Sequence, residues 1–183
     1  MAAGAVGALS SIPVGAALTA PTALPIHLVV ADQRFAASRV FAAEAARAGR
    51  RIAWTRGDVT RLWCDQLDLL WREQAAVVAG LTDPAAFFCL ERLALDRGLR
   101  VAFKGEHRRL ASGETSHVIA GHEGLETRVA FGPAWPAQAA RLVLAARNDG
   151  PAKVRLQTIG QAHAGQPPLL ISWVLAPKRQ SRI

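Results

Sequence analysis

The sequence lacks the regular features that mark fibrous, coiled-coil and disulfide-stabilised proteins. Its 183 residues show no Gly-x-y period and no heptad run, and they include only two cysteines. Hydrophobic residues nevertheless make up 51% of the chain and charged residues 20%, so the chain has enough apolar surface to form a folded core. The length and composition therefore predict one globular domain.

Blocks of basic residues are also missing, although the formal net charge at neutral pH is +8. All but three of the 22 basic residues are arginine, and they are scattered among acidic residues. The pairs Arg50-Arg51 and Arg108-Arg109 are shorter than the basic runs of about five to eight residues that bind nucleic acid. Nucleic acid is therefore not expected as a partner, and solvated surface charge accounts for the excess.

No charged residue occurs from Met1 to Ala31. Residues 3–18 are rich in alanine and glycine, and Pro13 makes a transmembrane helix a poor fit. The apolar segment 1–25 is typical of the central region of a secretory signal, which a basic region upstream of Met1 would complete. We expect export to the periplasm and no stable transmembrane span after processing. The alternative is a cytoplasmic protein with a disordered tail or an extra N-terminal helix.

Apolar strands alternate with amphipathic helices from residue 26 to residue 108. Strands without polar alternation are buried on both faces, which is typical of a parallel sheet covered by helices. The sequence therefore predicts an α/β fold with a three-layer, doubly wound, mainly parallel sheet of the Rossmann-like or flavodoxin-like kind. The expected strands are 26–31, 51–54, 75–79 and 101–104, and the expected helices are 35–48, 59–71 and 83–97.

The regular alternation is lost after Arg108, where antiparallel edge strands can join the sheet. The domain is expected to span 26–176 and to be followed by a basic tail over 177–183. The elements expected in this part are short strands at 116–120, 128–131, 154–159 and 169–175 and a helix over 136–147.

Ligands of open α/β sheets bind beyond the carboxyl ends of the strands. This rule selects the loops Asp32–Arg34, Arg56–Asp58, Gly80–Asp83 and Gly105–Arg108. The candidate ligand-binding residues in them are Arg34, Thr82 and Glu106, and the candidate catalytic residues, if the protein is an enzyme, are Asp32, Asp58 and His107.

Each candidate also has a structural interpretation. Asp58 and Asp83 are suited to helix N-caps, and Asp32 can cap the first helix or pair with Arg34. His107 beside a carboxylate is suited to acid/base chemistry near neutral pH, although adjacent side chains of an extended segment point to opposite sides.

The common signatures of nucleotide binding and catalysis are missing. The sequence contains no G-x-G-x-x-G, no P-loop, no G-x-S-x-G and no H-E-x-x-H. No metal site is expected, and no cofactor can be assigned. Cys64 and Cys89 lie in apolar helical segments, so they are expected to be small buried hydrophobic residues. Export would permit a disulfide between them without requiring one.

The stretch from Arg56 to Glu91 resembles a group of proteobacterial proteins of uncharacterised activity that are described as carrying a twin-arginine signal. The resemblance implies export of a folded α/β protein to the periplasm, and it implies no activity. The segments that carry it are Gly57-Asp58-Val59-Thr60, Leu62-Trp63, Trp71, Ala79-Gly80-Leu81-Thr82 and Phe88-Cys89-Leu90-Glu91.

Two classes of function remain open. The first is a non-catalytic binding or accessory protein that holds a small anionic or polar ligand at the carboxyl edge of the sheet, and a protein partner fits the accessory role. The second is a small hydrolase or isomerase that uses acid/base residues in the same cleft. Hydrogen bonding of His107 to Asp32 or Asp58 would favour the enzyme.

Overall fold

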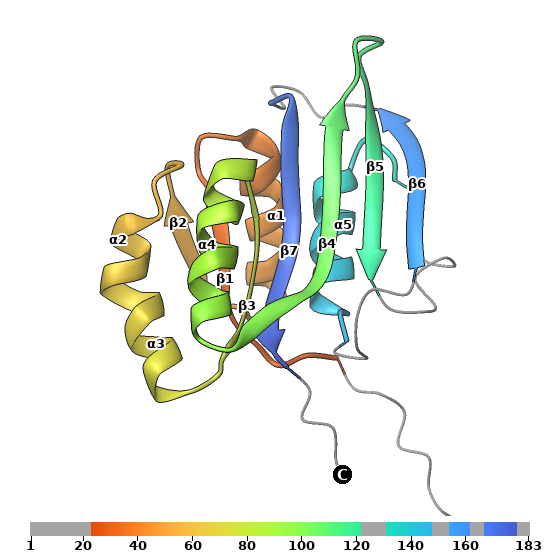
Figure 1. Cartoon of the computed structure of the whole chain (residues 1–183). Helices are drawn as coiled ribbons and strands as arrows, with labels where there is room; N and C mark the ends of the chain where they lie inside the picture. The colour runs from red at the N-terminus through yellow and green to blue at the C-terminus, as the bar shows by residue number, and fades with distance from the viewer. Residues whose placement is uncertain (1–22, 122–130, 148–153, 162–166, 179–183) are drawn as a thin grey trace, which may run out of the picture.

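The computed structural model describes residues 23–121, 131–147, 154–161 and 167–178, which form a mixed seven-stranded sheet between helices (Figure 1). The strands are β1 (Ile26–Asp32), β2 (Ile52–Thr55), β3 (Val77–Thr82), β4 (Leu99–Arg109), β5 (Glu114–Gly121), β6 (Val154–Gln161) and β7 (Leu169–Pro177). The helices are α1 (Ala36–Arg47), α2 (Thr60–Leu62), the π-helical turn η1 (Trp63–Leu67), α3 (Asp68–Glu73), α4 (Pro84–Asp96) and α5 (Trp135–Leu144).

The strand order is β2-β1-β3-β7-β4-β5-β6. β1 pairs in parallel with β2 and β3, as predicted for the first three strands. β7 lies antiparallel between β3 and β4, and β5 and β6 continue the sheet with antiparallel pairs. The α/β class is confirmed, but the prediction of a mainly parallel, doubly wound sheet is not, because most strand pairs are antiparallel.

The polarity of β4 and β7 explains this order. The residues of β7 between its two ends are all buried, so this strand needs cover on both faces and takes a central position. β4 carries Lys104, Glu106 and Arg108 at alternate positions, and all three are at least partly accessible to solvent. A strand with one polar face fits further from the centre of the sheet, and β4 is accordingly separated from β3 by β7.

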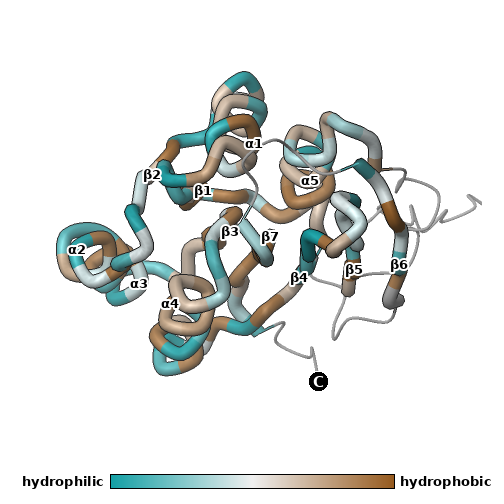
Figure 2. Tube along the Cα trace, turned by 90° about the horizontal axis from the view of Figure 1, so that it is seen from above, coloured by the Kyte–Doolittle hydropathy of each residue, from teal (hydrophilic) through white to brown (hydrophobic). Residues whose placement is uncertain are grey.

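The helices cover the two faces of the sheet unequally (Figure 2). α1 and α5 lie on one face, where the core includes Phe41, Trp135 and Val174. α2, α3 and α4 lie on the other face, where Leu90 and Trp173 are fully buried. In the described part of the chain, no helix covers β5 and β6 on the face opposite α5 (Figure 2).

Local sequence signals account for the helices. Asp83 Oδ1 accepts a hydrogen bond from Ala86 N at 2.8 Å, and Pro84 is the first residue of α4, as the N-cap prediction requires. The helix predicted over 59–71 forms, but η1 interrupts its α-helical hydrogen bonding. The buried stripe of these helices is confirmed, since Leu62 and Phe87 are both buried.

Several predictions fall outside the described residues. These include the signal-like segment up to residue 22, most of the strand predicted at 128–131 and the end of the basic tail. Among the described helices, none combines the length and the apolarity that a membrane crossing requires.

Candidate functional site

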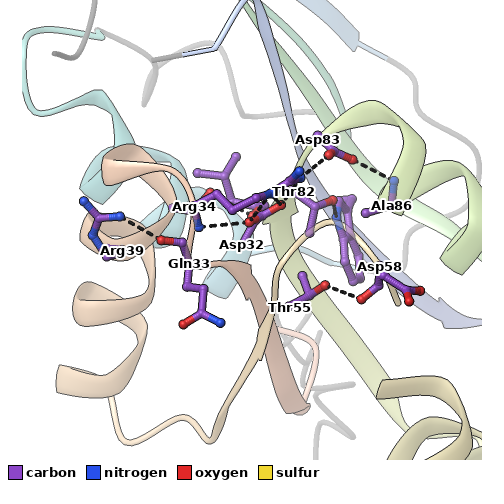
Figure 3. Close-up of polar contacts among 12 residues, drawn as sticks. Asp32, Gln33, Arg34, Arg39, Thr55, Asp58, Thr82, Asp83 and Ala86 are labelled. Carbon is purple, nitrogen blue, oxygen red and sulfur yellow. Dashed lines mark hydrogen bonds and ion pairs between the residues drawn. The ribbon is translucent and has the colours of Figure 1, made fainter. Parts of the chain in front are cut away.

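The carboxyl ends of β1, β2 and β3 bring together a group of polar residues that we call the strand-end cluster: Asp32, Arg34, Asp58 and Asp83 (Figure 3). Arg34 extends between two carboxylates. Its Nε donates to Asp32 Oδ1 at 3.0 Å, its Nη2 donates to Asp32 Oδ2 at 2.6 Å, and Nη2 also donates to Asp83. Asp32 is therefore paired with Arg34, which is one of the two roles that the sequence left open.

The charge of Arg34 is offset by these two carboxylates. Hydrogen bonding to Asp32 is the main reason that the pKa of Arg34 lies above its usual value, and Asp83 adds to the effect. The Asp32 side chain is fully buried, whereas the Arg34 side chain is 41% exposed. Arg34 thus supplies the counter-charge of a buried carboxylate. Its positive charge is already compensated and is not available to bind an anionic ligand.

Gly57 and Asp58 form the side of the cluster nearest α2. Gly57 has a φ of +93°, and the Arg34 guanidinium packs so closely on it that a Cβ would lie 2.6 Å from Arg34 Cζ. Asp58 Oδ1 accepts from Thr60 N at 2.8 Å, at the first residue of α2, and Thr55 Oγ1 donates to Asp58 O at 2.7 Å. The backbone N–H of Thr60 is the main cause of the lowered pKa of Asp58, which therefore remains ionised.

Thr82 lies beside the cluster but faces the core. Its side chain is buried, and its Oγ1 accepts a hydrogen bond from Trp173 Nε1 at 3.1 Å. This bond satisfies the indole N–H of a buried tryptophan. Thr82 therefore positions Trp173 under α4.

Glu106 and His107 lie elsewhere, because the fourth strand does not end at residue 104 as predicted. β4 continues to Arg109, so the predicted loop 105–108 is part of a strand. Two strands lie between β1 and β4, which at about 4.8 Å per strand puts His107 roughly 14 Å from the line of β1. His107 is thus out of hydrogen-bond reach of Asp32, and Glu106 instead pairs with Lys104 at 2.9 Å.

His107 belongs to a buried group beneath α5. It lies opposite His117 in the β4–β5 pairing, and the two Nδ1 atoms are 2.8 Å apart. His107 Nε2 lies 2.8 Å from Ser172 Oγ on β7. Trp135 stacks on His107 with ring centroids 4.4 Å apart, and Phe131 packs on His117 at 4.2 Å. We call His107 and His117 the histidine pair; both side chains are fully buried.

An open groove adjoins the strand-end cluster on its other side. It lies between the α2–η1 segment and α4, and it encloses about 470 Å³. Gly57 and Asp58 both line this groove, and Gly57 also packs against the Arg34 guanidinium. The rest of its lining is mainly apolar and consists of Val59, Thr60, Trp63, Ala85, Phe88, Cys89, Arg92 and Leu93.

Sequence reasoning missed this groove because it placed both cysteines in the core. Cys64 and Cys89 are in fact exposed free thiols, and only Cys89 lines the groove. Phe88 is 59% exposed and sits beside the buried stripe of α4. A large aromatic residue outside the apolar stripe of an amphipathic helix was the signal that could have indicated a surface site.

No protein-family model, curated protein or solved structure matches the chain. In the described ranges, histidine, cysteine and acidic side chains do not gather in threes or more as a metal site would need.

Proposed function

We propose that the protein binds a small molecule at the carboxyl edge of β1, β2 and β3. The observation that carries this proposal is the contact between an open apolar groove and the strand-end cluster at Gly57 and Asp58. A volume of about 470 Å³ lies within the range of small-molecule pockets, and such pockets combine apolar walls with a few polar groups. The apolar part of the ligand would lie against Phe88 and Leu93.

The charge of the site favours a ligand whose polar end donates hydrogen bonds. The sequence indicated an anionic or polar ligand, and the anionic choice relied on Arg34 and His107. Arg34 is already paired with two carboxylates, and His107 is buried in β4. The charged residues that line the groove are instead Asp58, which is ionised, and Arg92, whose Nη2 pairs with Glu91 at 3.7 Å. A hydroxyl, amide or ammonium group therefore suits the position beside Asp58 better than a carboxylate or phosphate.

The two free cysteines provide a direct test of binding. Octylamine, octanol and octanoate have the same apolar chain and differ in the polar end, and each can be added while a thiol reagent modifies the protein. Octylamine at about ten times its Kd should slow the modification of Cys89 about tenfold, because only unoccupied protein reacts there. Cys64 is exposed but does not line the groove, so its rate should not change.

Variants at two exposed apolar residues complete the experiment. Phe88→Ala should abolish the protection of Cys89, whereas Leu69→Ala, which removes a side chain of similar exposure outside the groove, should preserve it. Equal slowing at both cysteines, or protection that survives Phe88→Ala, would rule out the groove as the binding site. Stronger protection by octanoate than by octylamine would contradict the assigned role of Asp58.

Export to the periplasm is the second part of the proposal, and it is supported by the uncharged segment that precedes Asp32. Fractionation of the native host should place the protein in the periplasm. Mass spectrometry should find an N-terminus created by cleavage before Ile26, because a signal is removed from the mature chain. Cytoplasmic recovery of an unprocessed chain, with no basic codons in frame upstream of Met1, would contradict export.

A further inference from the structure

The histidine pair is surrounded by apolar groups and by few polar ones. Trp135 at the start of α5 covers His107, and Phe131 covers His117. The neighbouring strands contribute Ser172 from β7, close enough to His107 Nε2 to form a hydrogen bond. Strands β3 and β7 separate this pair from β1, at whose carboxyl end the proposed ligand site lies.

The hydrogen bonds favour one arrangement of the protons. Ser172 Oγ lies 3.5 Å from Gly105 O, to which its hydroxyl donates, so Ser172 Oγ accepts from His107 Nε2–H. Nδ1 of His107 then accepts from Nδ1–H of His117. His117 Nε2 is left as an acceptor, and it has no partner among the described residues. An unpartnered acceptor is less costly here than the buried N–H that the opposite arrangement would leave.

Carboxylates do not face the pair from the described elements packed around it. On β4 the charged residue of the same face is Arg109, which is exposed at the strand end. On β5, β6 and β7 the described side chains of this face are uncharged. On α5 the charged residue is Arg141, which pairs with Glu44 of α1 at 2.7 Å. These described elements therefore supply no carboxylate to offset a proton added to the pair.

We propose that the histidine pair makes the contact between the start of α5 and strands β4 and β5 acid-sensitive, so that proton uptake opens this contact while β1 and β3 stay folded. The first proton would place a positive charge between the rings of Trp135 and Phe131, where burial disfavours the charged imidazole. The second would put a hydrogen on both Nδ1 atoms, and the 2.8 Å contact between them would be lost.

The direction of the pH effect follows from burial. Desolvation is the main cause of the lowered pKa of both histidines. The pKa of His117 falls to about 4, and that of His107 lies well below its usual value, where the charge of His117 adds to the effect. The closed form therefore binds fewer protons than the open form, in which an exposed imidazole has a pKa of about 6.5. The contact is at full strength above that pH, and it weakens as the pH falls from about 6.5 towards about 4.

The opening is expected to be local because the described helices cover this part of the sheet on one face only. The described helices leave the other face of β5 and β6 uncovered, whereas β1 and β3 have helices on both faces (Figure 2). Regions with fewer buried contacts open more readily than the rest of a protein.

Amide hydrogen exchange of the full chain tests whether acid opens this contact locally. Exchange is followed by mass spectrometry at about pH 7 and about pH 5.5 and is corrected for intrinsic exchange. Peptides from β5 and α5 should lose protection, with the opening constant rising between about tenfold and about a hundredfold per pH unit below about 6.5, for one or two protons taken up. Peptides from β1 and β3 should keep their protection.

Two variants connect the effect to the histidine pair. His107→Gln combined with His117→Gln should remove the pH dependence in β5 and α5, whereas His27→Gln, at a partly exposed histidine of β1, should leave it unchanged. The wild-type protein alone can overturn the proposal, so the test remains valid even where the double variant fails to fold. Equal loss of amide protection in all strands of the wild type, or no loss in α5, would do so. Persistence of the effect in a folded double variant would also overturn it.

Discussion

Replacing Arg34 by alanine is expected to lower the free energy of unfolding by about 3 kcal/mol at neutral pH. Asp32 has no exposed surface, and three of the hydrogen bonds that it accepts come from the Arg34 side chain. Removing that side chain leaves the buried carboxylate without its counter-charge. The value lies at the low end for broken buried pairs because the Arg34 backbone N–H still donates to Asp32. Urea denaturation followed by circular dichroism measures the loss.

Arg39→Ala is the matched control for this prediction. Arg39 is an exposed arginine of α1 whose Nη1 donates to Gln33 O, so its loss should change stability by less than about 1 kcal/mol. The strand-end loops alone would suggest that Arg34 is a surface residue which can be removed without loss of stability. Equal, small effects of the two substitutions would support that interpretation and would show that Asp32 does not depend on Arg34.

Gly80→Ala is expected to lower the Tm by about 6–12 °C, which corresponds to at least about 3 kcal/mol for a protein of this size. A Cβ at Gly80 would lie 2.6 Å from Cζ2 of Trp173 and within the contact radius of the Val30 carbonyl oxygen. Both neighbours belong to strands that flank β3, and Trp173 is fully buried. Neither can move without disturbing the centre of the sheet, so the added methyl group cannot be accommodated cheaply.

Gly132→Ala provides the comparison for calorimetry. A Cβ there would meet nothing within 4 Å, and the residue does not have a positive φ. Its Tm should stay within about 2 °C of the wild type, since an unstrained surface substitution has little effect. A similar Tm for both variants would mean that β3 and β7 are less tightly packed than the structure indicates.

The elements that sequence predicted well are those specified by nearby residues. Asp83 and Pro84 mark the start of α4 because the cap and the fixed proline φ act within one turn. The first three strands also follow from local pattern, since each is a short apolar run linked to the next by one helical segment. Right-handed connections then make them parallel, with β1 between β2 and β3.

The position of β7 could not be predicted in the same way. Its partners β3 and β4 are distant in sequence, and an apolar run alone does not say which strands it will join. The alternation of Lys104, Glu106 and Arg108 did contain a warning, because it predicts a strand with one accessible face in place of a loop. Taking that alternation into account would have extended the predicted fourth strand past residue 104. His107 would then have been placed within the strand and outside the expected cleft.

The candidate site was predicted in part for a similar reason. Asp32, Arg34 and Asp58 follow directly from the ends of the parallel strands, and the structure brings them together. The partners of His107 depend on pairing across the sheet: Ser172 is 65 residues away in the sequence, and its contact with His107 requires β7 to lie beside β4. No local pattern contains that information.

The central place of β7 also has a consequence for synthesis on the ribosome. β7 is the last described strand to emerge, yet it separates β3 from β4 in the finished sheet. Until it arrives, a nascent chain can pair β1 with β2 and β3, and β5 with β4 and β6, but these two halves have no strand to join them. Both halves then expose an unpaired edge, which is a hazard for aggregation. The sheet is therefore completed only after translation has passed Pro177, and chaperones that shield strand edges would act during that interval.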